Sequence, residues 1–135
     1  NRFRAGKTAS QTLSGTAATF QKLTFPISVT ADSSYNTSSS TFTAPSAGTY
    51  FFMAQVQSLQ SVAGNTDDAI AIYKNGALYT RGTNLNGVAY PSFFVADCIP
   101  LAAGDTIEIY FRPKVSGLQI EGNANTAFFT GVKLV

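Results

Sequence analysis

Apolar side chains recur at every second position in several separate runs of this chain. Residues 50–56 alternate in this way, as do residues 107–111 and residues 128–134. A period of two is typical of β-strands with one buried face, and no run of useful length shows the period of a helix. We therefore expect an all-β fold whose core includes Tyr50, Phe52, Val56, Ile107, Ile109, Phe128 and Val132.

Turn residues separate these runs. Asn75-Gly76 lies between two apolar runs, and both residues tolerate the positive φ that the centre of a type I′ hairpin requires. Asp105 follows Gly104, a position at which an aspartate caps backbone N–H groups. Short strands with regularly spaced turns are typical of an antiparallel sandwich or jelly roll. A chain of 135 residues suits a single domain of this kind, spanning residues 1–135.

The strand expected at residues 50–56 is apolar on both faces. Phe51 and Met53 lie opposite Tyr50 and Phe52, and a second pair of adjacent aromatic residues follows at residues 128–129. An antiparallel strand normally keeps one polar, solvated face. The second apolar face should therefore be covered, either by a partner subunit or by a loop of the same chain.

The side chains that most enzymes use are scarce. The chain has no histidine, which excludes Ser-His and Cys-His arrangements and all imidazole metal ligands. Charged residues make up only 12% of the chain, and nothing pairs the seven carboxylates for glycosidase chemistry. We therefore expect a protein without enzymatic activity.

The remaining features bear on cofactors and partners. Asp67 and Asp68 could bind calcium through oxygen ligands, or could simply be exposed, and no other cofactor is indicated. The apolar neighbours of Cys98 favour a buried, inert thiol. The basic residues are scattered, and the group at residues 2–7 is interpreted as a solvated strand edge, so we expect no nucleic-acid partner. The sequence has no run of about 20 apolar residues, so we expect no membrane insertion.

Several separated motifs occur in the order found in one known family. Tyr35 is followed by FTAPSAGTYFF, KNG, LAAGDTIEI and FFTGVKLV, which contain Phe42, Pro45, Gly48, Tyr50, Phe52, Asn75, Gly76, Leu101, Gly104, Asp105, Phe129 and Gly131. The chain resembles the C1q globular domain, within the C1q and tumour-necrosis-factor-like superfamily, over nearly its whole length. The resemblance implies a ten-stranded antiparallel jelly roll and a compact homotrimer. The composition is more similar to the C1q-like heads of bacterial or bacteriophage fibres than to animal members.

The resemblance also implies which residues meet in the trimer. In this family, the strand after the Pro-x-x-Gly turn points one face at the threefold axis. The implied interface residues are Phe51, Met53, Gln55, Phe129 and Phe93, or Phe94 in place of Phe93.

The implied function is a non-enzymatic recognition head at the tip of a fibrous surface or virion protein. Such a head would be extracellular, on a cell surface or on a virion, and would bind a receptor or a surface glycan. Loop residues that could stack on a sugar or hydrogen-bond to it are Tyr79, Arg81, Asn84, Asn86 and Tyr90; the alternative is that they are ordinary loop residues. The alternative function is purely structural, as a trimerisation cap or a capsid or fibre protrusion.

Overall fold

The computed structural model describes residues 2–30, 34–59, 68–84 and 90–135. These residues form an all-β sandwich of antiparallel strands and contain no helix, so none of them forms a helix that could cross a membrane. Within the described ranges the strands are numbered to β14, more than the ten that the resemblance implies, because several are separate pieces of two or three residues.

The first sheet contains the two longest strands of the protein. Its strand order is β10-β11-β7-β14-β1-β4. The bounds are β10 (Thr83–Asn84), β11 (Ser92–Leu101), β7 (Gly48–Gln57), β14 (Phe128–Lys133), β1 (Arg2–Gly6) and β4 (Ile27–Thr30). Sequence neighbours are rarely sheet neighbours here, which is the connectivity of a jelly roll.

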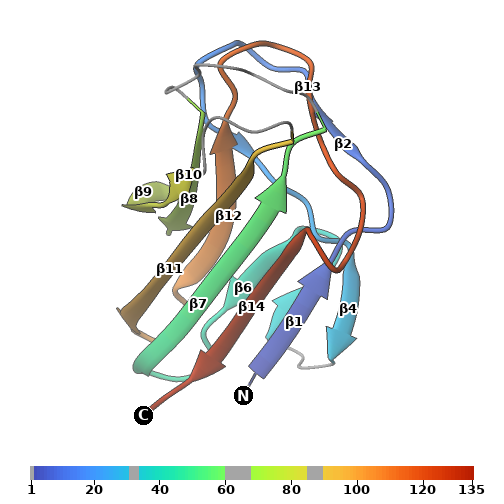
Figure 1. The fold of residues 1–135 in the computed structure, drawn as a ribbon. Coiled ribbons are helices and arrows are strands. Elements are labelled where there is room, and N and C mark those ends of the chain that lie inside the picture. The colour runs from blue at the N-terminus through green and yellow to red at the C-terminus, as the bar shows by residue number, and fades with distance from the viewer. Residues whose placement is uncertain (1, 31–33, 60–67, 85–89) are drawn as a thin grey trace.

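The second sheet packs against the first and completes the sandwich (Figure 1). Its order is β5-β6-β12-β8-β9, and β3 also pairs with β12. The bounds are β5 (Tyr35–Asn36), β6 (Thr41–Thr43), β12 (Thr106–Arg112), β8 (Ala69–Lys74), β9 (Ala77–Arg81) and β3 (Gln21–Lys22). A separate pair, β2 (Gln11–Leu13) and β13 (Leu118–Ile120), lies at the end of the sandwich opposite the two chain ends (Figure 1).

The predicted turns are confirmed. β8 and β9 form a hairpin in which Asn75 has a φ of 51° and Gly76 a φ of 78°, as a type I′ turn requires. Asp105 accepts a hydrogen bond from the backbone N–H of Ala102 at 2.8 Å and another from the Asn75 side chain at 2.9 Å. Both hydrogen bonds lower the pKa of the Asp105 carboxyl, and the bond from Asn75 has the larger effect.

Aromatic side chains fill the space between the sheets. The Phe3 ring stacks on the Tyr35 ring at 4.7 Å between centroids, and Phe42 stands edge-on to Phe52 at 5.1 Å. These contacts join strands of both sheets into one hydrophobic core. Five of the residues that alternation assigns to the core are buried there, with at most 1% of their surface exposed: Tyr50, Phe52, Val56, Ile107 and Ile109.

The predicted facing of β14 was wrong. Phe129 pairs with Ala54 across the sheet and is fully buried in the core, not at an interface. Phe128 and Val132 therefore lie on the opposite face of the sheet, outside the core cluster. The two adjacent phenylalanines offer the same hydrophobicity to either face, so the sequence alone does not decide which one points inward.

Packing around Gly131 explains this choice of facing. Gly131 pairs with Phe52, so it shares the inward face with Phe129. A Cβ atom at Gly131 would lie 2.7 Å from ring atoms of both Phe3 and Phe52. The absence of a side chain therefore makes room for two core rings, which a strand with the other facing would not provide.

Candidate interaction surface

The first sheet presents an uncharged row of side chains on the face that points away from the core. β7 pairs with β11 on one side and with β14 on the other, so alternate residues of all three strands share this face. We call it the outer face, and it consists of Phe51, Met53, Gln55, Phe94, Ala96, Cys98, Phe128, Thr130 and Val132. These nine residues include no charged side chain, and Gln55 and Thr130 are the two with an amide or a hydroxyl group.

Phe51 lies in the middle of this face. It pairs with Cys98 on β11 and with Val132 on β14. Phe51 and Met53 are half-buried, and Phe94 is 42% exposed. Large apolar side chains of the adjacent strands β7 and β11 thus still face solvent in the single chain.

Polar groups at the border of the outer face are satisfied within the protomer. The hydroxyl of Thr130 donates a hydrogen bond to the Phe3 carbonyl at 2.8 Å. The guanidinium of Arg4 lies 4.0 Å from the centre of the Phe128 ring and donates a hydrogen bond to the Ala124 carbonyl. The Arg4 contact covers most of Phe128, which is only 8% exposed.

One predicted interface position on β11 is corrected. Phe93 is 1% exposed and packs edge-on against Phe111 of the second sheet at 4.7 Å. Phe94 takes the outward position instead and pairs with Gln55. Neighbouring residues of a strand point to opposite faces, so burial of Phe93 fixes the exposure of Phe94.

Cys98 also differs from its prediction. The thiol is exposed rather than buried, because Cys98 pairs with Phe51 on the outer face. Its neighbour Ile99 points inward and is fully buried. The apolar neighbours along the chain were therefore a poorer guide than the alternation of the strand.

Comparison with known proteins identifies the fold. No family model matches the sequence, and no curated protein matches it. Murine APRIL at pH 5.0 superposes with a TM-score of 0.73 at 14% identity, covering 98% of each chain. The globular domain of zebrafish complement 1qA protein gives a TM-score of 0.72 at 13% identity, covering 99% of this chain and 97% of that one. The chain has the C1q/TNF-like fold. Eiger TNF from S. frugiperda gives 0.70 at 14% identity, covering 99% and 92%.

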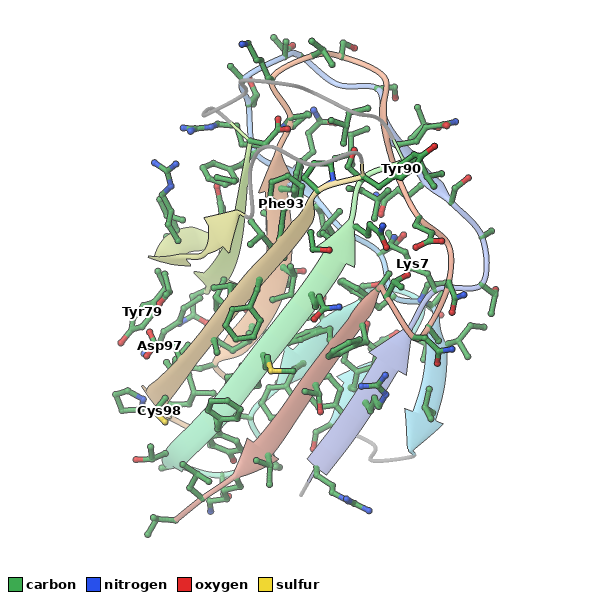
Figure 2. All side chains as sticks on the ribbon, viewed as in Figure 1. Lys7, Tyr79, Tyr90, Phe93, Asp97 and Cys98 are labelled. Atoms are coloured by element: carbon green, nitrogen blue, oxygen red, sulfur yellow. The ribbon has the colours of Figure 1, made fainter. Side chains whose placement is uncertain are left out.

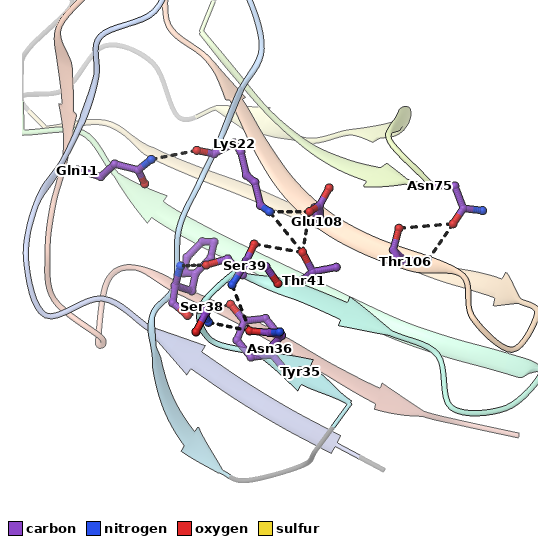
Figure 3. A network of polar contacts seen from close by, with 12 residues as sticks. Gln11, Lys22, Tyr35, Asn36, Ser38, Ser39, Thr41, Asn75, Thr106 and Glu108 are labelled. Atoms are coloured by element: carbon purple, nitrogen blue, oxygen red, sulfur yellow. Dashed lines mark hydrogen bonds and ion pairs between the residues drawn. The ribbon is translucent and has the colours of Figure 1, made fainter.

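The second sheet of this C1q/TNF-like jelly roll has a charged outward face (Figure 3). Lys22 lies 2.6 Å from the Glu108 carboxylate, which also accepts a hydrogen bond from the Thr41 hydroxyl at 2.7 Å. The side chain of Gln11 donates to the Lys22 carbonyl at 2.9 Å. This network resembles an ordinary solvated sheet face, in contrast to the outer face of the first sheet.

Stacked tyrosines lie beside that network. The rings of Tyr73 and Tyr110 are 3.9 Å apart between centroids, and the Phe20 ring is edge-on to Tyr73 at 5.7 Å. Partial burial raises the pKa of both tyrosine hydroxyls, and the Glu108 charge adds to the effect at Tyr110. Each of the two tyrosine rings covers one face of the other, and both residues are half-buried.

The predicted ligand-binding residues do not form one site. Tyr79 and Arg81 are exposed on β9, whereas Tyr90 lies at the end of the sandwich far from the chain ends (Figure 2). Asn84 belongs to β10, and Asn86 lies outside the described residues. Tyr79 and Tyr90 remain the two most exposed tyrosines, at 46% and 53%.

The predicted calcium ligands lack support where the structure describes them. Asp68 is 3% exposed, and one of its carboxylate oxygens accepts the backbone N–H of Lys114 at 2.6 Å. Asp67 lies outside the described residues. Within residues 2–30, 34–59, 68–84 and 90–135, no three acidic or cysteine side chains cluster as metal ligands would.

Lys7 is buried, contrary to the expected solvated strand edge. It is 1% exposed, donates a hydrogen bond to the side-chain oxygen of Gln11 at 2.5 Å, and lies 5.2 Å from the Phe25 ring centre. Burial lowers the pKa of its ammonium group to about 8. No feature of the sequence distinguishes Lys7 from the exposed basic residues.

Proposed function

We propose that this protein is a non-enzymatic, homotrimeric recognition head at the tip of an extracellular fibre, a cell-surface protein or a virion protein. The observation that supports it is the uncharged outer face of β7, β11 and β14, which leaves Phe51, Met53 and Phe94 open to solvent. A second copy of the chain would cover these residues. C1q-like domains, which the sequence resembles, assemble as compact homotrimers.

Three copies can cover such faces if each contact is heterologous. In a heterologous contact, one surface of a protomer meets a different surface of its neighbour, and the ring closes when the rotation fits. The edge strand β9 offers a second exposed apolar surface, because Leu78 is 48% exposed and Tyr79 is 46% exposed. Obligate interfaces of this kind commonly bury more than about 2,000 Å².

A Phe51→Asp variant is expected to lose the trimer. The carboxylate would be placed, unpaired, in an apolar contact, which costs several kcal/mol per site. Light scattering after size-exclusion chromatography should give three times the 14.3 kDa chain mass for the natural protein and one chain, or unfolded protein, for the variant. The matched control is Val29→Asp, because Val29 is 54% exposed on the edge strand β4 and lies outside the outer face. A folded, trimeric Phe51→Asp protein would refute this use of the outer face.

Recognition is the second part of the proposal. The two described chain ends lie at one end of the sandwich, so a stalk attached there would leave the opposite loops free to meet a receptor or glycan (Figure 1). Glycan arrays and cell-binding assays with the soluble trimer test this part. The outer face alone would equally suit a purely structural trimerisation cap or fibre protrusion. If a correctly assembled trimer binds none of a broad panel of glycans and host cells, that result would favour the structural role.

A further inference from the structure

The residues that follow β7 pair with the end of β13. Ser58 forms an antiparallel bridge with Ile120. On one side of this bridge the Leu59 N–H donates to the Gln119 carbonyl, and on the other the Glu121 N–H donates to the Gln57 carbonyl, both at 2.9 Å. These bonds extend the sheet at the end of the sandwich that lies far from the chain ends.

The residues around this bridge present one face to solvent. Ser58 and Ile120 are fully buried. Because strand residues alternate, the residues on either side of each must point outward. With the neighbouring Tyr90 they form what we call the distal patch: Gln57, Leu59, Tyr90, Gln119 and Glu121.

Tyr90 is held in this patch in an unusual backbone conformation. Its φ is +60°, in the left-handed region that bulky residues rarely adopt. The side chain of Gln57 donates to the Tyr90 carbonyl at 3.3 Å, and the N–H of Ser58 donates to the carbonyl of Pro91 at 3.0 Å. Such conformations cost free energy and concentrate at functional positions. Here the strained residue is an aromatic ring that remains 53% exposed, at the position labelled in Figure 2.

We propose that the distal patch binds a neutral saccharide by stacking it on the ring of Tyr90. This inference rests on the proposed recognition role and names the ligand class and the site. Tyrosine offers a rigid apolar face together with a hydroxyl, and the two glutamines and one glutamate carry the amide and carboxylate groups that pair with sugar hydroxyls. The carboxylate of Glu121 is fixed by a hydrogen bond of 2.6 Å from the Thr126 hydroxyl, so its position is set before a ligand arrives.

Charge and shape narrow the ligand class. The five side chains of the patch include one carboxylate and no cation, which favours neutral sugars over sialylated or sulfated ones. No pocket exists within the part of the chain that the structure describes. A shallow, polar patch around one ring suits a saccharide, whereas a peptide anchored by apolar side chains would need a recess. Three copies in a trimer would add avidity to weak individual sites.

The test compares variants of two exposed residues, Tyr90 and Val29, on an array of oligosaccharides. The array carries chains ending in galactose, glucose, mannose or N-acetylhexosamine, together with sialylated counterparts. Tyr90→Ala should reduce binding to neutral glycans about tenfold, whereas Tyr90→Phe should retain most of it, because the ring still stacks. Val29→Ala truncates an exposed side chain of β4 that lies outside both the outer face and the distal patch, so it is the control and should leave binding unchanged.

The outcomes separate this inference from the broader proposal. If light scattering shows no trimer for the natural protein, the proposed assembly fails, and the array still tests the patch in the single chain. If the trimer forms but binds no neutral glycan, the saccharide site is overturned while assembly stands. Binding restricted to sialylated glycans, or binding lost in Val29→Ala but kept in Tyr90→Ala, would also overturn the site.

Discussion

A Phe129→Ala variant is expected to lose about 3–5 kcal/mol of the free energy of unfolding. Phe129 is fully buried and contacts the rings of Phe3, Tyr35 and Phe25, with centroid separations of 4.8, 5.8 and 5.9 Å. Truncation would leave a cavity where aromatic residues of both sheets meet, and close-packed rings around it relax only partly. Denaturant unfolding at a fixed chain concentration measures the loss.

The neighbouring residue supplies the control. Phe128→Ala removes the same atoms from the opposite face of β14, where the ring contacts the Arg4 guanidinium rather than the core. We expect a smaller loss, about 2 kcal/mol, from the cation–π contact and from the apolar area that the Phe128 ring buries outside the core. Equal losses for the two variants, or a greater loss for Phe128→Ala, would contradict the facing of β14.

The contrast between β7 and β14 shows how far the sequence could predict this fold. Residues 50–56 alternate over a long run, and Tyr50 and Phe52 point inward as that alternation predicts. In β14, two adjacent residues are both phenylalanine and point to opposite faces of the sheet, so hydrophobicity does not decide which face is buried. The deciding contact, Gly131 against the rings of Phe3 and Phe52, joins residues that are far apart in the sequence.

The candidate sites divide in a similar way. Phe51 and Met53 could be assigned to the outward face because they alternate along β7 with apolar residues that point into the core. The alternation of β11 also indicates the outward positions of Phe94 and Cys98, because their neighbours Val95 and Ile99 are apolar and buried. The distal patch could not be predicted, because Gln57 and Gln119 become neighbours only through the pairing near β13.

The free energy of unfolding should rise with pH between about 8 and 10, and Lys7 should be the main cause. Burial lowers the pKa of Lys7 from 10.5 to about 8, so in this range the unfolded chain holds a proton that the folded chain has released. Stability therefore increases with pH, and below pH 8 the folded state carries the full cost of a buried ammonium. The cost is roughly 3 kcal/mol, since one unit of pKa corresponds to about 1.4 kcal/mol.

A Lys7→Met variant should remove both the cost and its pH dependence. Loss of the hydrogen bond to Gln11 offsets part of the gain, so we expect about 1–2 kcal/mol of added stability at pH 7. The oxygen of Gln11 keeps a second donor, the backbone N–H of Thr24 at 2.9 Å, so it is not left unpaired. Denaturant unfolding at pH 7, 8, 9 and 9.5 gives both quantities.

The exposed residue Lys114 provides a matched control, because Lys114→Met removes the same charge from a residue that is not buried. This variant should keep the rise in stability with pH.

The pH series should end below pH 10. Above that pH, Tyr35 acts in the opposite direction, since burial raises the pKa of its hydroxyl to about 12 and the unfolded chain ionises first. If Lys7→Met is less stable than the natural protein at pH 7, or if its stability still rises from pH 8 to 9.5, the buried ammonium is not the source of the pH dependence.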